Sequence, residues 1–394
     1  MPSAEAPQPD RVLAAVTELA EQLAARSGEI EQAGRLPADV VAALRNARVF
    51  SLWMPRELGG LEAEPDTVLQ VVQTLAAADG STGWCVATGL ASNCVGAFVS
   101  EKGARELYPT GLEIAGGALM PGGRATPQPD GSYLVQGRWS FGSGVEHCDW
   151  VVGGVLVTDP AGPADPAGAG QGPPDVRAVV MPAAEVEVVQ NWDAIGLQGT
   201  ASGDFRAEGV RVRPEHTLKP DRLEPWPAGP MWRIPLPSLL FPVLAAVPLG
   251  LARRAVDELA GLAATKTPFR STRLLADREV LQADLARASA LVESGHQYLL
   301  ASMRALWQAA AAGGVPTVRQ RAQVRLAAAH ATAGAAEAVQ LCYRSAGSTA
   351  VWRGHPLERL LRDVNAATQH YGISPVVYEA AGRVLLGREP DPGL

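Results

Sequence analysis

The sequence has few cysteines, few aromatic residues and no excess of positive charge. Its 394 residues include only four cysteines, which show neither CxxC spacing nor a pairing pattern. A disulfide framework is therefore not expected, and a reduced, cytoplasmic protein with small buried thiols is. The net charge of −7 argues against nucleic acid or an anionic membrane as a partner, because both attract clustered Lys and Arg. The acidic, proline-containing amino terminus does not resemble a signal peptide.

Several motifs that would indicate other chemistry are also missing. There is no GxGxxG after a strand, no GxxxxGK[ST] and no GxSxG, so neither a Rossmann site, a P-loop nor a hydrolase elbow is indicated. A single ExxH, Glu293 to His296, is too little for a di-iron site, and we expect no metal. The longest apolar run, 236–252, contains three prolines and favours a buried helix start over a membrane span. The arginine cluster 319–325 is interpreted as a solvated or intersubunit helix face.

The hydrophobic period changes twice along the chain. Val12, Val16, Leu19 and Leu23 recur at helical spacing and open a helical domain expected over 9–113. The period then becomes two, and short strands are predicted over a central β-domain, 114–220. Their predicted ranges are 133–139, 151–157, 176–181, 186–189 and 205–212. A Pro/Gly/Ala tract, 159–175, is predicted to be a mobile loop.

The remainder, 221–394, is rich in Ala, Leu and Arg and predicts four or five long helices in a bundle. The fold class is therefore α+β, mostly α. Small Ala-dominated helix faces allow close packing and suit a bundle that also contacts other subunits. A homo-oligomer is expected.

Four stretches in order resemble the acyl-CoA dehydrogenase superfamily. Residues 54–60 are similar to its P-x-x-x-G-G stretch, and 194–202 to its G-x-x-G-[TS]-x-S turn beside the flavin. Residues 266–269 are similar to the R-x-x-F stretch that reaches a neighbouring subunit's cofactor, with lysine in the arginine position. Residues 346–363 are similar to the G-G-x-G…P-x-x-R-x-x-R-D segment. The resemblance covers about residues 10 to 388 and implies an N-terminal helical domain, a central β-barrel domain, a C-terminal four-helix bundle and a homotetramer.

One replacement separates this chain from the dehydrogenases themselves. Acyl-CoA dehydrogenases usually keep a glutamate base about eight residues after the Arg-Asp pair, whereas here Arg362-Asp363 is followed by His370. Abstracting a proton next to a thioester requires a carboxylate within reach, and Glu379 lies two helical turns further on. The R-D-x₆-H pattern, together with 137–150, resembles the group D flavin-dependent monooxygenases, which include the oxygenase components of p-hydroxyphenylacetate hydroxylase and seco-steroid phenol hydroxylase.

The resemblance implies reduced FMN or FAD and O₂ as cofactors, with a flavin C4a-hydroperoxide that delivers one oxygen atom to an aromatic or polycyclic small molecule. A separate NAD(P)H:flavin reductase would supply the reduced flavin. His370 is the catalytic candidate, as a hydrogen-bond donor to the hydroperoxide or as a base, a role typically worth ~10²–10⁴-fold in rate. Ser143 would hydrogen-bond flavin N5. Further candidate flavin contacts are Trp139, Thr200, Ser202, Lys266, Gly347 and Ser348, the last two from a neighbouring subunit, and candidate pocket residues are Trp84, Asn93 and Tyr371.

Three alternatives remain. One is N- or S-oxygenation by an enzyme of the same group. The second is a true acyl-CoA dehydrogenase with a relocated base. The third is a scaffold with the same fold but no catalytic role, whose contacts are only oligomeric.

Overall fold

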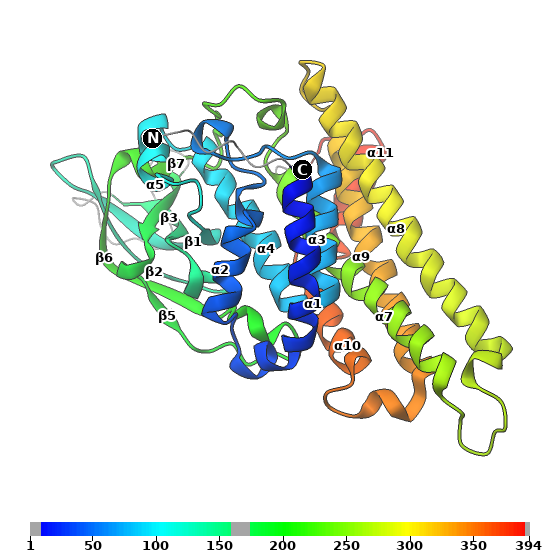
Figure 1. The fold of residues 1–394 in the computed structure, drawn as a ribbon. Helices are drawn as coiled ribbons and strands as arrows, with labels where there is room; N and C mark the ends of the chain where they lie inside the picture. Colours follow the sequence, from blue (N-terminus) through cyan, green and yellow to red (C-terminus); the bar gives the residue numbers. More distant parts are fainter. Residues whose placement is uncertain (1–8, 159–173, 391–394) are drawn as a thin grey trace.

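The sheet lies at one side of the fold, and the N-terminal helices lie between it and the long C-terminal helices (Figure 1). The computed structural model describes residues 9–158 and 174–390, so most of the predicted loop 159–175 lies outside the described residues. The N-terminal helices are α1 (Pro9–Ala33), α2 (Ala38–Asn46), α3 (Pro65–Ala78), α4 (Gly80–Asn93) and α5 (Glu101–Leu107). The C-terminal helices are α6 (Pro237–Leu244), α7 (Ala246–Thr265), α8 (Glu279–Ala311), α9 (Val318–Ala346), α10 (Pro356–Ala367) and α11 (Val376–Leu385).

The N-terminal stripe forms as the sequence predicts. Val12, Val16, Leu19 and Leu23 are all buried on one face of α1, which packs against α3. Helix α4 is apolar on nearly all sides because it is enclosed, with contacts to α3, α6, α7 and β1. It therefore lies where the sheet meets the two helical layers.

The β-domain is one seven-stranded sheet in the order β5-β6-β2-β1-β3-β4-β7. The strands are β1 (Ala115–Pro127), β2 (Tyr133–Trp139), β3 (Trp150–Val157), β4 (Val176–Pro182), β5 (Glu187–Val189), β6 (Asp204–Val212) and β7 (Thr217–Leu218). Among the strands that the structure describes, only β1 and β3 pair in parallel. Strands β4 and β6 touch although they are not neighbours in the sheet, so the sheet curls around its own core, as in a partly closed barrel.

The proline-containing run at the start of the C-terminal part folds as two consecutive helices. Pro242 lies inside α6, which ends at Leu244, and α7 begins at Ala246. The joined segment Pro237–Thr265 is long and apolar enough to cross a membrane by length and composition, but 72% of its most apolar window is buried inside the fold. It is a core helix pair, as the sequence indicates, and it packs against α3 and α4.

Candidate functional site

Trp84 of α4 joins two groups of side chains that are far apart in the sequence. Its indole Nε1 donates a hydrogen bond to Ser143 Oγ at 3.1 Å. The edge of its ring meets the imidazole of His370, with ring centroids 5.7 Å apart. Trp84 is itself buried, so it fixes the loop after β2 relative to the turn after α10.

Three hydroxyl groups continue from Trp84 in a single line. Ser143 Oγ lies 2.7 Å from Ser202 Oγ, and Ser202 Oγ lies 2.6 Å from Thr200 Oγ1. Thr200 donates its hydroxyl hydrogen to the Leu197 carbonyl at 2.7 Å. Since each hydroxyl has one hydrogen, Ser202 must donate to Thr200, and Ser143 must donate to Ser202.

We call Trp84, Ser143, Ser202 and Thr200 the hydroxyl chain. Its donors all run the same way, toward the Leu197 carbonyl. Ser143 Oγ therefore keeps one lone pair and no spare hydrogen. Toward any further group it can act only as an acceptor.

The two loops that carry this chain have strained backbone. Phe141, Leu197 and Ala201 have φ values of 64°, 52° and 46°, in the left-handed region that non-glycine residues seldom adopt. Such strain persists where the surroundings impose it, and it clusters at functional sites.

Helix α10 imposes this shape on the loop 196–202. Asp363 Oδ1 accepts the Leu197 N–H at 2.6 Å, and a Cβ on Gly196 would lie 2.3 Å from the carbonyl oxygen of Arg362. Burial raises the pKa of the Asp363 carboxyl to about 7. The Arg362-Asp363 pair of the sequence thus has a structural role here: the Asp363 carboxylate is bonded to the backbone of the loop 196–202 and holds that loop in its shape.

His370 lies in the turn after α10 with a defined tautomer. Its Nδ1 accepts the backbone N–H of Gly372 at 3.1 Å, so the neutral ring carries its hydrogen on Nε2. Burial, and next the positive charge of Arg325, lower the pKa of His370 to about 4. The imidazole is therefore neutral at physiological pH and presents an N–H donor.

Aromatic rings surround this imidazole. Tyr371 stacks on it at 5.0 Å, and Phe241 of α6 lies 6.1 Å away. The guanidinium carbon of Arg325, from α9, lies 4.3 Å from the Phe241 ring centroid. We call Phe241, Arg325, His370 and Tyr371 the imidazole pocket; Tyr371 is 58% exposed and marks its open side.

Two other residues predicted to contact flavin or substrate, Trp139 and Asn93, are buried. Trp139 is buried in the β-domain core, stacked on Phe205 at 5.1 Å, with its Nε1 donating to the Gly154 carbonyl. Asn93 is fully buried, and its amide bonds three backbone groups, those of Phe50, Glu113 and Ala115. Their roles in flavin and substrate contact remain predictions.

Lys266 lies at the end of α7, where it caps α9. Its Nζ donates to the Ala346 carbonyl and to Thr349 Oγ1, both at 2.7 Å. Gly347 follows at once with φ 65° and ψ −149°, a conformation that only glycine adopts readily. Gly347 and the neighbouring Ser348 are exposed. The structure thus brings Lys266, Gly347 and Ser348 together, and their contact with a neighbouring subunit's flavin remains a prediction.

The histidine of the ExxH pattern has a structural environment. His296 Nδ1 lies 2.9 Å from Gln73 Nε2. Within the described ranges, no group of three or more His, Cys, Asp or Glu side chains is placed to hold a metal ion.

Five residues near the site were not among the site residues predicted from the sequence. Phe141 and Ile195 expose 72% and 69% of their surface on the two strained loops, and Trp192 packs edge-on against Phe141. Phe241 lies in the proline-containing apolar run 236–252, which the sequence indicated only as a buried helix start. Arg325 is only 7% exposed, so the expectation of a solvated helix face is wrong for it.

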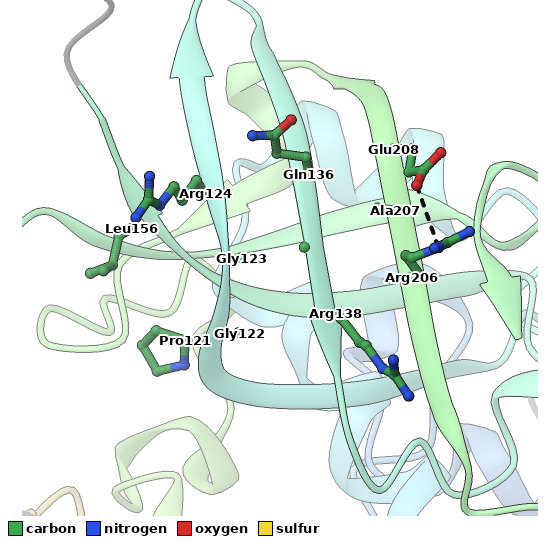
Figure 2. Close-up of a pocket in the computed structure, with 11 residues that line it drawn as sticks. Pro121, Gly122, Gly123, Arg124, Gln136, Arg138, Leu156, Arg206, Ala207 and Glu208 are labelled. Carbon is green, nitrogen blue, oxygen red and sulfur yellow. Dashed lines mark ion pairs between the residues drawn. The ribbon is translucent and has the colours of Figure 1, made fainter. Parts of the chain in front are cut away.

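A cavity of about 630 Å³ lies elsewhere, on β1, β2, β3 and β6 (Figure 2). It shares no residue with the hydroxyl chain or the imidazole pocket. Its cations Arg138 and Arg206 pair with Asp204 and Glu187. This cavity is a poor candidate for the reaction, because its lining includes none of the residues predicted to contact flavin or substrate.

Comparisons with known proteins place the chain in one family. Residues 10–111 match the acyl-CoA dehydrogenase N-terminal domain, and residues 242–375 match the C-terminal domain. Over 94% of its length the chain is 32% identical to an indole-3-acetate monooxygenase of Pseudomonas putida, 92% of which is covered.

Two further comparisons cover nearly the whole chain. It is 26% identical to the oxygenase component of an FADH₂-dependent resorcinol hydroxylase of Rhizobium, with 98% of each chain covered. The crystal structure of the HsaA monooxygenase from M. tuberculosis superposes with a TM-score of 0.88 at 24% identity, over 98% of this chain and all of the other. The last result shows the fold alone.

Proposed function

We propose that this chain, which belongs to the flavin-dependent monooxygenases of the acyl-CoA dehydrogenase superfamily, hydroxylates an aromatic small molecule as the oxygenase component of a two-component enzyme. Reduced FMN or FAD and O₂ are its cofactors. The described residues carry no nicotinamide-binding motif, and the resorcinol hydroxylase relative is named an oxygenase component. A separate NAD(P)H:flavin reductase therefore supplies the reduced flavin.

The residues around the hydroxyl chain fit a planar, partly polar ring system. When bound, the reduced flavin supplies two electrons, so that one oxygen atom of O₂ enters the substrate and the other leaves as water. Phe141 and Ile195 offer exposed apolar surface on the two loops that carry the hydroxyl chain, and Ser143 offers an acceptor. Together they would hold the ring edge and exclude water from it.

The acceptor role of Ser143 matches the protonation of a reduced flavin, whose N5 carries a hydrogen. Because Trp84 and Ser202 take up the other hydrogen-bonding positions of Ser143, a hydrogen bond from N5–H is the one that the serine can still complete. Such preorganised contacts cost little reorganisation during the reaction.

His370 acts as a hydrogen-bond donor in this proposal. Its Nδ1 lone pair is occupied by the Gly372 N–H, and its pKa of about 4 makes it a weak base. Nε2–H can donate to an oxygen atom as negative charge develops there. Of the two roles expected from the sequence, the geometry favours donation.

The bridge through Trp84 is the observation that carries the proposal. It puts the imidazole of His370 against the indole that donates a hydrogen bond to Ser143. Glu379 is exposed on α11, and Asp363 is committed to the Leu197 amide. Neither carboxylate is placed as the base of a dehydrogenase.

Isotope incorporation tests the function. The protein is mixed with chemically reduced FMN or FAD under ¹⁸O₂, with indole, resorcinol and indole-3-acetate as trial substrates. One ¹⁸O atom in a ring-hydroxylated product is expected. Quantitative release of peroxide with every aromatic compound, or flavin bleaching by an acyl-CoA, would refute the proposal.

A further inference from the structure

The backbone of Leu197 joins three parts of the fold. Its carbonyl oxygen accepts the Thr200 hydroxyl at 2.7 Å, which is the last hydrogen bond of the hydroxyl chain. The same oxygen accepts the indole N–H of Trp192 at 3.0 Å, and that indole packs edge-on against Phe141. The Leu197 N–H donates to Asp363 Oδ1 at 2.6 Å. A single residue therefore connects the hydroxyl chain, the ring beside Phe141 and helix α10.

Helix α10 holds the segment around Leu197 in place. The φ value of Leu197 is 52°, in the left-handed region that a leucine seldom adopts unless its surroundings impose it. Arg362 Nη1 donates to the Ile195 carbonyl at 3.1 Å. Gly196 packs so closely on α10 that a Cβ there would lie 2.3 Å from the Arg362 carbonyl oxygen. Three successive loop residues are therefore fixed to this helix.

The Asp363 carboxyl also touches the helix that carries Trp84. It is buried, and a Cβ on Gly80, the first residue of α4, would lie 2.9 Å from its Oδ2. Trp84 follows Gly80 by about one helical turn. Helix α10 itself ends shortly before His370. The carboxyl thus lies where the supports of the hydroxyl chain and of the imidazole pocket meet.

We propose that Asp363 is a positioning residue for oxygenation, because its bond to the Leu197 amide fixes both the hydroxyl chain and the indole that supports Phe141. This inference rests on the proposed function, in which Ser143 and Phe141 border the flavin. A displacement of about 1 Å at a reacting centre can cost on the order of 10²-fold in rate. Protonated or ionised, Asp363 keeps an oxygen that accepts an N–H, so the acceptor and not the charge carries this role.

Hydrogen exchange in the flavin-free protein tests the anchoring directly. Asp363→Ala removes the acceptor of the Leu197 amide and should speed amide exchange in the segment 194–202 about 10-fold. Asp363→Asn keeps an oxygen acceptor and should leave exchange near the wild-type rate. Gly196→Ala pushes the loop away from α10 from the other side of the contact and should also speed exchange.

Flavin binding and oxygen use test the consequence for the site. Titrated anaerobically with reduced flavin, Asp363→Ala and Gly196→Ala should bind it about 10-fold more weakly than the wild type. With O₂ and an aromatic substrate, the ratio of peroxide to product should rise about 10- to 100-fold in both variants. Asp363→Asn should stay close to the wild type in both measurements.

Two control variants separate positioning from a loss of stability. Glu62→Ala removes a buried carboxylate that accepts the Trp232 indole at 2.7 Å, outside the hydroxyl chain and the imidazole pocket. It should lower stability and keep wild-type coupling. Gly261→Ala adds a methyl group where nothing lies within 4 Å and should behave like the wild type. If Asp363→Ala does not fold, Gly196→Ala and Asp363→Asn decide the question.

The outcomes distinguish the inference from the function on which it rests. Wild-type exchange, flavin affinity and coupling in Asp363→Ala and Gly196→Ala would overturn the positioning role, and so would equal uncoupling in Glu62→Ala or in Asp363→Asn. In each of these cases ¹⁸O incorporation by the wild type leaves the proposed function standing. If Asp363→Ala and Gly196→Ala loosen the loop and weaken flavin binding but the wild type oxygenates no aromatic compound, the positioning role stands and the proposed function fails.

Discussion

The hydroxyl chain and the imidazole pocket meet where Trp84 contacts His370, but they use their polar groups in opposite ways. In the hydroxyl chain every hydrogen has a partner inside the protein, ending on the Leu197 carbonyl. In the imidazole pocket, His370 Nδ1 accepts the Gly372 N–H, so that Nε2–H is the donor that the ring can offer. A fully hydrogen-bonded network fixes the geometry of a site, whereas a polar group with an unused donor can take part in the chemistry.

The largest effect is expected in the imidazole pocket. His370→Ala should reduce product formation by about 10²- to 10⁴-fold and divert O₂ to peroxide. His370→Gln keeps an N–H donor but cannot serve as a base, so it should recover part of the coupling. Product and peroxide are quantified per reduced flavin consumed.

A histidine outside the site provides the control for this pair. His296 is bonded to Gln73, and His296→Ala should couple like the wild type. If His370→Gln behaves like His370→Ala while a proton acceptor such as His370→Asp restores activity, the base role is correct and the donor role is wrong.

Breaking the hydroxyl chain should have a smaller, mixed effect. Ser143→Ala leaves the buried Trp84 Nε1 without its acceptor, which should lower the free energy of unfolding by about 1–3 kcal/mol. It should also increase peroxide release, because the acceptor for flavin N5–H is lost. Urea unfolding and peroxide assays measure the two parts.

A substitution further along the hydroxyl chain tests whether the direction of its hydrogen bonds matters. Ser202→Ala removes the acceptor of Ser143 but leaves the Ser143 oxygen in place, so its hydroxyl is free to rotate. We expect weaker uncoupling than in Ser143→Ala. Equal uncoupling in both variants would mean that the direction of the chain has no role.

The pH dependence of stability should reflect the neutral imidazole. The pKa of His370 is lowered to about 4, below its ordinary value of 6.5. Between these pH values the unfolded chain binds a proton that the folded chain does not. The contribution of His370 to stability should therefore be constant above about pH 6.5 and fall as the pH drops toward 4.

His147 adds to the same slope, because burial lowers its pKa to about 4 as well. Urea unfolding at a series of pH values should show a shallower decline in His370→Phe than in the wild type. An identical decline in the two proteins would mean that His370 is not buried as a neutral ring.

The smallest effect is expected at Lys266, outside both groups. Lys266→Met removes two hydrogen bonds at the end of α9 and should cost about 1–3 kcal/mol. Lys266→Arg should recover most of that stability. Flavin affinity measured in the same variants tests the predicted cofactor contact, which requires a loss of affinity beyond the loss of stability.

The sequence indicated the fold well because helices and strands leave periodic patterns. The stripe on α1, the alternation in β2 and the change of period near residue 114 all depend on burial, which is local in its signature. The ordered motifs then placed Ser143, Ser202, Thr200 and His370, and the structure brings these residues together through Trp84.

The remaining features of the site depend on tertiary contacts, which the local sequence does not reveal. Nothing in the local sequence tells that Arg325 faces Phe241 rather than solvent, because a lone arginine in a basic helix usually lies on an exposed face. The tautomer of His370 depends on one backbone amide, and the direction of the hydroxyl chain depends on one carbonyl. Trp139 fits its motif, but its burial against Phe205 follows from the curl of the sheet.

The most direct test compares two variants by the fraction of consumed O₂ that appears in product. We propose that an imidazole, and not an acidic side chain, acts at the reacting edge of the flavin. Glu379→Gln should then put the same fraction of O₂ into product as the wild type, and His370→Ala should convert nearly all of its O₂ to peroxide. Full coupling in His370→Ala together with a loss of activity in Glu379→Gln would contradict it.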